Sequence, residues 1–292
     1  MRVLVIGGNG FIGRVLITML LAKQCNVVNV YRRMQDPLHE GVENICLNRK
    51  DIPAFRRRLQ GKSFDAVVDL AAFTRKDVEV VNESLRADVY VLISSSAVYG
   101  EISSCHIDES TAVSTCQHHK YGHNKIQAED AVRKRTHVII RPAVVYGEDD
   151  SHEERGRYFF EEIHKDKIAF PGKIFVRNSY IYVEDLACLI VASLLSSKKN
   201  VTVNAAGIHF DWDTYLKTMA QVCDVPLPEI ENLNLSLSEF RDYAKNNKIR
   251  FPHNAFHDFV VNCDLAQKLY DWQPKISLEE GLSRTKKWAL GR

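Results

Sequence analysis

The first two-thirds of the chain alternates short apolar runs with segments of helical periodicity. The runs predicted to be strands are Val3–Ile6, Val27–Tyr31, Ala66–Leu70, Val89–Ile93, Val138–Arg141 and Val201–Asn204. Most are continuously apolar, which is typical of parallel strands buried on both faces. Between the first two, Ile12, Val15, Leu16, Met19 and Leu20 recur at helical spacing. This alternation predicts an α/β fold with a doubly wound parallel sheet.

The pattern loosens after Gly147, which indicates a second, smaller unit. We predict a Rossmann-fold domain formed by residues 1–147 and 181–206, and a mixed C-terminal substrate-binding domain formed by residues 148–180 and 207–292. Ligands of such sheets bind beyond the carboxyl ends of the strands, so the site is expected where the two units meet. Helix caps are expected from Glu184 or Asp185, and from Asp211 or Asp213.

The composition is that of an ordinary globular protein: 292 residues, 45% hydrophobic and 26% charged. No apolar run approaches the roughly 20 residues that cross a bilayer, and the N-terminus lacks the pattern of a secretory signal. Seven scattered cysteines suit reduced thiols. The formal charge of +2 and the short basic clusters give little support to nucleic-acid binding. We therefore expect a cytoplasmic protein that does not enter a membrane.

A glycine-rich turn connects the first predicted strand to the first predicted helix. Gly7 allows a tight turn, Gly10 lets the backbone approach a pyrophosphate, and Gly13 permits close packing of the helix on the strand. The helix N-terminus offers free N–H groups to the anion. This context makes the glycine spacing specific for a dinucleotide. The expected cofactor contacts are Gly7, Asn9, Gly10, Phe11, Ile12 and Gly13.

The end of the second predicted strand bears on the choice of nicotinamide cofactor. An acidic residue there would accept hydrogen bonds from the ribose 2′-hydroxyl of NAD(H). This chain instead continues from Tyr31 into Arg32 and Arg33, with no carboxylate before Asp36. Two guanidinium groups suit a 2′-phosphate, although they could also be a solvated pair in a surface loop. The sequence favours NADP(H) over NAD(H).

Tyr121 and Lys125 lie four residues apart on a helix predicted from Lys120 to Lys134, so their side chains share a face. A free tyrosine has a pKa near 10, and a neighbouring ammonium favours its phenolate form and lowers that pKa. Ser95 or Ser96 could supply a second hydrogen bond to a substrate oxygen. Such a Tyr-Lys pair is common on helix surfaces, but its place in a nucleotide-binding fold favours carbonyl/alcohol chemistry.

Taken together, the motifs resemble the NAD-dependent epimerase/dehydratase family, the extended short-chain dehydrogenases/reductases. The similarity covers nearly the whole chain. It rests on the glycine turn, Leu70-Ala71-Ala72, Ser94-Ser95-Ser96-Ala97-Val98-Tyr99-Gly100, Tyr121-Gly122-x-x-Lys125, Arg141-Pro142, Tyr146-Gly147, Tyr182-Val183-Glu184-Asp185-Leu186-Ala187, Trp272-Gln273-Pro274 and Leu278-Glu279-Glu280-Gly281-Leu282.

The resemblance implies roles for individual residues. Tyr121 would be the catalytic acid/base, and Lys125 would both lower its pKa and bind the nicotinamide ribose. Ser95 matches the family's catalytic hydroxyl, with Ser96 as the second choice. The implied cofactor contacts add Leu70, Ala71 and Ala72 in the dinucleotide cleft, Pro142 near the nicotinamide, and Asn48 where an aspartate usually contacts the adenine. The implied substrate is a sugar or sugar nucleotide, and a homodimer is expected by resemblance alone.

Several departures from the family pattern narrow this expectation. Ser96 and Ala97 replace the Asp-Glu pair that performs water elimination, which argues against a 4,6-dehydratase. Val144 and Val145 fill a stretch where sugar-nucleotide enzymes often have asparagine. Asn178 stands where an arginine commonly grips the diphosphate, although the adjacent Arg177 could substitute. These changes weaken the sugar-nucleotide assignment. The chain is also shorter than many epimerases of this family, and its length, with Arg32 and Arg33, favours a reductase that takes NADPH from solution over an epimerase.

Two features of the sequence allow other interpretations. Cysteines and histidines between Cys105 and His123 could ligate zinc, but their spacing matches no closed structural site, so we expect no metal. The rival function is a cofactor-binding protein of the same fold that binds RNA or senses redox state with little catalysis. The Tyr121–Lys125 pair argues against it, because a pure binding protein has no physical need for that pair.

Overall fold

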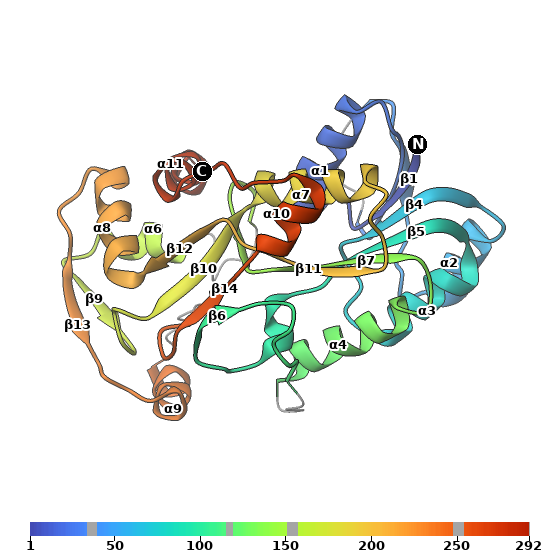
Figure 1. Ribbon diagram of the computed structural model, residues 1–292. Coiled ribbons are helices and arrows are strands. Elements are labelled where there is room, and N and C mark those ends of the chain that lie inside the picture. Colours follow the sequence, from blue (N-terminus) through green and yellow to red (C-terminus); the bar gives the residue numbers. More distant parts are fainter. Residues whose placement is uncertain (34–39, 115–118, 151–156, 248–253, 292) are drawn as a thin grey trace.

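The computed structural model describes residues 1–33, 40–114, 119–150, 157–247 and 254–291. Its centre is a seven-stranded, wholly parallel sheet in the order β11-β7-β5-β4-β1-β2-β3 (Figure 1). The strands are β1 (Arg2–Ile6), β2 (Asn26–Tyr31), β3 (Glu43–Cys46), β4 (Ser63–Asp69), β5 (Arg86–Ile93), β7 (His137–Pro142) and β11 (Val201–Ala205). The predicted doubly wound sheet and its six predicted strands are confirmed, and β3 is an additional edge strand.

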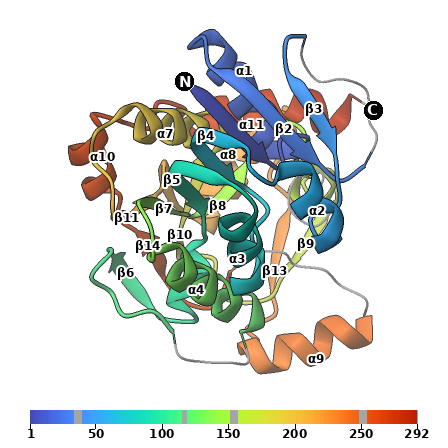
Figure 2. The ribbon, with the colours of Figure 1, turned by 90° about the vertical axis from the view of Figure 1, so that its right-hand side faces the viewer.

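Alternation along each strand divides the core into two layers. Val3 and Val5 pack on one face with Leu16 of α1, whereas Leu4 and Ile6 pack on the other. Helices α1 (Phe11–Ala22), α7 (Val183–Leu195) and α10 (Asp264–Tyr270) cover the first face, and α2 (Ile52–Leu59), α3 (Arg75–Ser84) and α4 (Lys120–Val132) cover the second (Figures 1 and 2). The continuous apolar runs in the sequence follow from burial on both faces.

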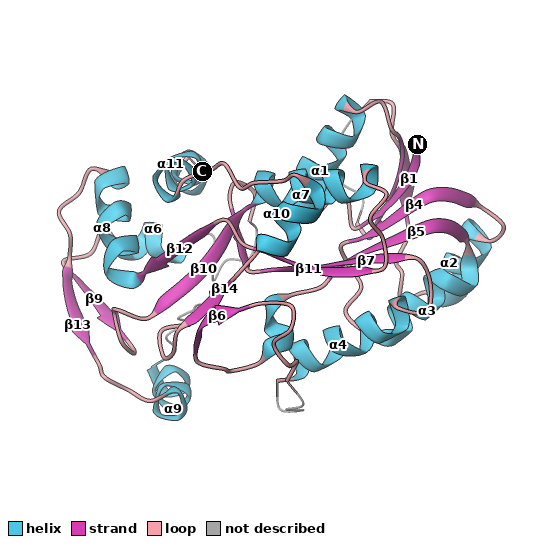
Figure 3. Ribbon diagram, viewed as in Figure 1, coloured by secondary structure: helices cyan, strands magenta, loops and turns pink. Residues whose placement is uncertain are grey.

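A second, smaller sheet lies beyond the carboxyl ends of the central strands (Figure 3). Its order is β12-β10-β14-β6, and β8 also pairs with β10. The strands are β6 (Ser104–Ile107), β8 (Val144–Tyr146), β10 (Arg177–Tyr182), β12 (Ile208–Asp211) and β14 (Phe259–Val261). Because β6 and β8 come from within residues 1–147, both parts of the sequence contribute to this sheet. The division into two domains stays a prediction.

The remaining elements surround this second sheet. They are α6 (Tyr158–Glu162), α8 (Trp212–Cys223), α9 (Leu237–Asn247), α11 (Leu278–Leu290), and the paired strands β9 (Lys167–Phe170) and β13 (Glu229–Asn232). Within the described ranges, no helix has both the length and the apolar character needed to span a bilayer.

The helix caps follow the sequence expectations in one case and depart from them in another. Asp211 caps α8 by accepting a hydrogen bond from the Thr214 N–H at 2.8 Å, as predicted. Asp185 does not cap α7: its carboxylate accepts the N–H groups of Lys275 and Ile276, at 2.9 and 3.1 Å. The cap prediction for the Glu184–Asp185 pair is therefore wrong, because Asp185 is used to fix the chain that leads into α11.

Candidate active site

The glycine turn places the N-terminus of α1 at the carboxyl end of β1. Gly7 has a φ of 93° and donates its N–H to Val30 O at 2.8 Å. A Cβ at Gly13 would lie 2.4 Å from Gly8 Cα and 2.5 Å from Gly8 O, so no other residue allows the helix to start this close to the turn. Gly10 precedes the helix and has no side chain to cap it. The first-turn N–H groups therefore fit a phosphate group.

A buried asparagine that was not predicted from the sequence anchors the glycine turn. Asn29, fully buried in β2, donates through Nδ2 to Asn9 Oδ1 at 2.8 Å and to Asn44 Oδ1 at 2.9 Å. Asn9 belongs to the glycine turn and Asn44 to β3, so Asn29 joins three segments. The signal in the sequence was a lone polar residue inside an apolar strand.

The region expected to hold the adenosine end contains a buried ion pair. Arg49 donates to both carboxylate oxygens of Asp69, at 2.7 and 3.0 Å, and Tyr90 donates to the same carboxylate at 2.6 Å. The neighbouring Asn48 is exposed, and its Oδ1 accepts the Lys50 N–H at 3.0 Å. Arg49 is thus the inward-facing residue of this loop, and a contact between Asn48 and the adenine stays a prediction.

Arg32 and Arg33 follow β2 directly and are exposed. They lie at the carboxyl end of β2, which pairs with β1. The 2′-phosphate of NADP(H) is expected at this end of the strand. Asp36 lies outside the described residues. The preference for NADP(H) stays a prediction.

Lys125 is buried between the ends of two central strands. Its side chain is 2% exposed, and Nζ donates to Ala72 O, after β4, and to Ile93 O, at the end of β5, both at 2.8 Å. Tyr121, one turn earlier on α4, is 46% exposed. The Lys125 nitrogen lies 5.8 Å from the centre of the Tyr121 ring and 4.9 Å from that of Phe73. The two residues of the predicted pair are therefore neighbours with contrasting exposure.

Burial lowers the pKa of the Lys125 ammonium. Removal from water lowers its pKa from 10.5 to about 8, and the nearby Asp69 carboxylate opposes this effect only in part. We expect the Lys125 side-chain resonance to titrate near pH 8 in an NMR experiment on labelled lysines, and the Lys125→Met variant to lack that transition. Since the folded pKa lies below the unfolded one, this group makes the free energy of unfolding rise with pH between about 8 and 10.5. Lysine transitions that all lie above pH 10 would contradict this assignment.

The three serines after β5 point to different neighbours. Ser94 is buried and donates to Glu129 Oε1 at 2.6 Å. Ser95 and Ser96 both line a cavity, and Ser95 Oγ accepts the Ala97 N–H at 3.1 Å, which leaves its hydroxyl hydrogen for a ligand. The structure thus brings both candidate serines to the cavity and does not decide between them.

Gly122 explains why the serines and the tyrosine meet. A Cβ at Gly122 would lie 2.3 Å from Ala97 O. Helix α4 therefore packs its backbone directly against the 3₁₀ turn η1 (Ser96–Tyr99), which follows Ser95. This close approach brings Tyr121 to the edge of the same cavity.

A buried polar network connects α4 to the central sheet. Glu129 accepts hydrogen bonds from Arg141 Nε at 2.9 Å and Arg141 Nη2 at 2.7 Å, besides the one from Ser94. Arg141 also donates to Tyr99 Oη at 3.1 Å, and Tyr99 donates to Asn204 Oδ1 at 2.7 Å. Burial alone would raise the pKa of Glu129, but the hydrogen bonds from Arg141 and Ser94 lower it below its usual value. The network ties the helix that carries Tyr121 and Lys125 to the central sheet.

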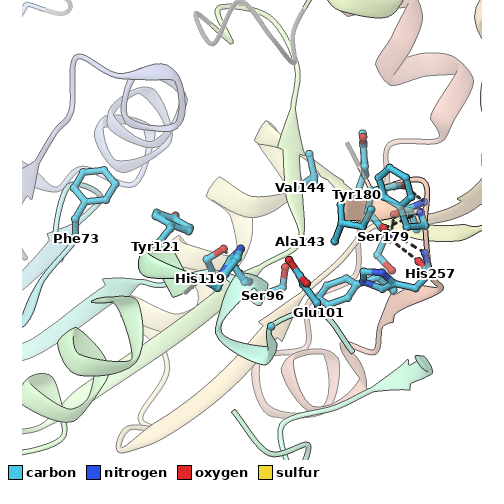
Figure 4. Close-up of a pocket in the computed structure, with 18 residues that line it drawn as sticks. Phe73, Ser96, Glu101, His119, Tyr121, Ala143, Val144, Ser179, Tyr180 and His257 are labelled. Atoms are coloured by element: carbon cyan, nitrogen blue, oxygen red, sulfur yellow. Dashed lines mark hydrogen bonds between the residues drawn. The ribbon is translucent and has the colours of Figure 1, made fainter. Parts of the chain in front are cut away.

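A cavity of about 830 Å³ opens beside these residues (Figure 4). Phe73 and Tyr121 lie at one end and Ser179, Tyr180 and His257 at the other, with Ser96 and His119 between them. The lining residues are Phe73, Ser95, Ser96, Ala97, Gly100, Glu101, His119, Tyr121, Ala143, Val144, Asn178, Ser179, Tyr180, Leu237, Asn254, Phe256, His257 and Phe259. The buried Pro142 directly precedes the lining residue Ala143. The cavity thus joins the predicted catalytic residues to the second sheet.

Arg177 does not line this cavity. Its guanidinium donates to Asp258 Oδ2 at 3.2 Å and also contacts Cys105, and it is exposed. The expectation that Arg177 could take the place of a diphosphate-binding arginine at position 178 is therefore wrong. The next residue, Asn178, does line the cavity, whereas the Arg177 guanidinium is held by Asp258.

The cysteine- and histidine-rich stretch forms no metal site among the described residues. Cys116 and His118 lie outside them. Of the described residues in this stretch, His119 lines the cavity and Cys105 contacts Asp258 and Arg177 on the surface.

Comparisons with known proteins place this geometry in a family. The profile of the NAD dependent epimerase/dehydratase family matches residues 3–206. A curated relative, 2'-dehydrokanamycin reductase from Streptomyces kanamyceticus, is 34% identical over 139 residues, which cover 46% of this chain and 38% of that protein. This chain therefore spans well under half the length of that relative.

Two solved structures share the fold over the full chain. A UDP-glucuronic acid 4-epimerase from Bacillus cereus, in complex with UDP-4-deoxy-4-fluoro-glucuronic acid and NAD, has a TM-score of 0.77 and 18% identity, covering 100% of this chain and 99% of its own. A dTDP-glucose 4,6-dehydratase from Bacillus anthracis, in complex with NAD, has a TM-score of 0.78 and 16% identity, covering 100% and 97%. Sequence identities this low show that the fold is shared and show nothing about function. The family profile is stronger evidence, because it matches residues 3–206, well over half of this chain. The chain belongs to the NAD dependent epimerase/dehydratase family.

Proposed function

We propose that this protein is a nicotinamide-dependent oxidoreductase that interconverts a ketone and a secondary alcohol on a sugar-type substrate, with reduction by NADPH favoured over epimerisation. The observation that carries the proposal is the position of Lys125. Its buried ammonium lies between the ends of β4 and β5, 5.8 Å from the ring of Tyr121, and Tyr121 lines a cavity large enough for a sugar.

The residues divide the chemistry among them. A bound nicotinamide supplies or accepts the hydride. Tyr121 gives its phenolic proton to the carbonyl oxygen as the alcohol forms, and takes it back in the reverse direction. The Lys125 ammonium stabilises the resulting phenolate, and Ser95 donates a second hydrogen bond to the substrate oxygen, with Ser96 as the alternative. Tyr121 is half-exposed toward the cavity, so its hydroxyl can reach a substrate there.

The cofactor site fits the residues present. The glycine turn and the uncapped start of α1 would hold the pyrophosphate, and Leu70, Ala71 and Ala72 would line the cleft next to Lys125. Pro142 would lie near the nicotinamide. The water-elimination chemistry of a 4,6-dehydratase is not proposed, because Ser96 and Ala97 offer no carboxylate beside Ser95.

Freshly purified protein tests the direction of the reaction. We expect it to contain little bound nucleotide, to bind NADPH reversibly, and to transfer deuterium from [4-²H]NADPH to the alcohol carbon of a keto-sugar. Stoichiometric, tightly held NAD⁺ would instead favour epimerase chemistry. Absence of any deuterium transfer across a panel of keto-sugars would contradict the proposal.

The two arginines after β2 provide a test of cofactor choice. Each guanidinium can make a charge-assisted hydrogen bond to a 2′-phosphate, and such bonds contribute about 1.5–3 kcal/mol. The variant with Arg32→Ala and Arg33→Ala is expected to bind NADPH at least about tenfold more weakly, with NADH affinity nearly unchanged, as measured by fluorescence titration. Equal loss of affinity for both cofactors, or no loss, would contradict the assignment.

A matched control uses another exposed basic pair. Arg57 and Arg58 lie in the last turn of α2 and are exposed. Replacing both with alanine removes the same net charge away from the end of β2. This control should leave NADPH affinity close to that of the unchanged protein.

The expected homodimer and the cytoplasmic location remain part of this proposal, since both rest on the resemblance and the composition. Sedimentation of the purified protein would test the first, and fractionation of cells that express it would test the second.

A further inference from the structure

The cavity beside Tyr121 has little positive charge. Among its described lining residues there is no lysine or arginine, and Glu101 is the charged side chain. Its polar groups include the hydroxyls of Ser95, Ser96, Ser179 and Tyr121, the amides of Asn178 and Asn254, and the imidazoles of His119 and His257. Burial lowers the pKa of His257, which favours its neutral form. A diphosphate placed here would lose its hydration without gaining a cation from the described lining residues.

The two asparagines cannot offer a substitute for such a cation. Asn254 donates through Nδ2 to Asn178 Oδ1 at 3.2 Å and to His257 O, while its own Oδ1 accepts the Phe256 N–H at 3.1 Å. Asn178 in turn donates through Nδ2 to Val176 O at 3.3 Å and to Asn254 O at 3.2 Å. We call these two residues the amide pair. Their hydrogen-bonding groups satisfy each other and the backbone, so the pair forms a neutral wall.

Two arginines of the described part of the chain that contact residues near the cavity are also held by carboxylates. Arg177 does not line the cavity and is held by Asp258, which accepts its backbone N–H at 2.8 Å and its guanidinium at 3.2 Å. Arg241, on α9, donates to Glu101 Oε1 at 2.8 Å, so its charge is balanced by the carboxylate of a lining residue. Neither arrangement leaves a guanidinium for a phosphate in the cavity.

We propose that the substrate is a polyhydroxylated ketone or alcohol without a phosphate group, that is, a free or glycosidically linked sugar rather than a sugar nucleotide. This inference rests on the function proposed above and names its substrate class. Tyr180, Phe256 and Phe259 supply apolar surface for the C–H face of a sugar ring, and the serine hydroxyls and imidazoles supply neutral hydrogen-bonding partners for its hydroxyls.

Direct binding tests the substrate class without depending on turnover. The Tyr121→Phe variant, with its cofactor site saturated by NADP⁺, is titrated with UDP and with UDP-glucose in a calorimeter. We expect no saturable heat up to about 5 mM nucleotide. The heat of the preceding NADP⁺ titration shows that the sample is folded and able to bind ligand. Saturable binding of UDP or UDP-glucose in the micromolar range would overturn the inference.

Turnover gives a second, matched comparison. Methyl 3-keto-glucoside and its 6-phosphate differ only in the phosphate ester. We expect kcat/KM to be at least about tenfold lower for the phosphate, since the described lining residues offer it no cation. A preference for the phosphate would overturn the inference. If neither compound reacts, the result counts against the proposed function, while the UDP titration still decides the substrate class.

The control variant is Arg177→Ala. Because Arg177 is held by Asp258 and does not line the cavity, its removal should leave the ratio of kcat/KM values unchanged. A fall in kcat/KM for the 6-phosphate alone in this variant would show that Arg177 reaches the phosphate and would overturn the inference.

Discussion

Replacing Tyr121 with phenylalanine is expected to lower kcat by about 10²–10⁴-fold, the usual contribution of a positioned acid/base group. The substitution removes one oxygen from a side chain that is half-exposed, so the fold and the cofactor site should be little affected. The measurement is steady-state reduction of a keto-sugar by NADPH, together with the Kd of NADPH from fluorescence. The expected pattern is a large loss in kcat with a nearly unchanged Kd.

Tyr270 provides the control for this substitution. It lies on α10, away from the cavity, and its hydroxyl meets Lys198 O at 3.4 Å. Tyr270→Phe makes the same chemical change and should leave kcat unaltered. If Tyr121→Phe retained full activity, another group would have to supply the proton, and the proposed role of Tyr121 would be lost.

Replacing Arg141 with methionine is expected to be strongly destabilising. The change leaves the fully buried Glu129 carboxylate without its main partner, and breaking a buried ion pair in this way costs about 3–5 kcal/mol. Urea unfolding measures this as a loss in the free energy of unfolding. Because Glu129 is on the same helix as Tyr121 and Lys125, cofactor affinity should fall in parallel.

A second arginine on the same carboxylate gives a close control. Arg133 reaches Glu129 Oε2 at 3.0 Å but is half-exposed, and exposed pairs contribute about 0–1 kcal/mol. Arg133→Ala should therefore cost far less than Arg141→Met. The double variant with Glu129→Leu and Arg141→Met should recover part of the loss, because it removes the unpaired charge. Equal losses in the free energy of unfolding for Arg133→Ala and Arg141→Met would contradict the claim that burial of the Glu129–Arg141 pair determines the cost.

The central sheet was predictable because its strands are unusual in composition. Strands buried on both faces must be continuously apolar, and that pattern is visible in runs such as Val138–Arg141. The edge strand β3 was missed since, of its four residues, Ile45 alone is buried. Strand β6 was missed for the same reason, with Ile107 its one buried residue.

The candidate site was predictable only in part. The spacing of Tyr121 and Lys125 on one helix revealed their proximity, whereas the contrast in their exposure depends on how α4 packs against the serine turn through Gly122. The amide pair was beyond sequence reasoning, because Asn178 and Asn254 lie 76 residues apart and meet through tertiary structure. The contact of Arg177 with Asp258 was likewise beyond sequence reasoning, because the two residues lie 81 positions apart.

A crystal structure of the protein with NADP⁺ tests the central claim most directly. The account predicts a pyrophosphate on the glycine turn, a ribose hydroxyl bonded to Lys125 Nζ, and the reactive carbon of the nicotinamide facing the cavity beside Tyr121, with room for a substrate carbon at about 3–3.5 Å. A nicotinamide ring placed away from Tyr121, or a cofactor that leaves Lys125 bonded to Ala72 and Ile93 alone, would contradict it.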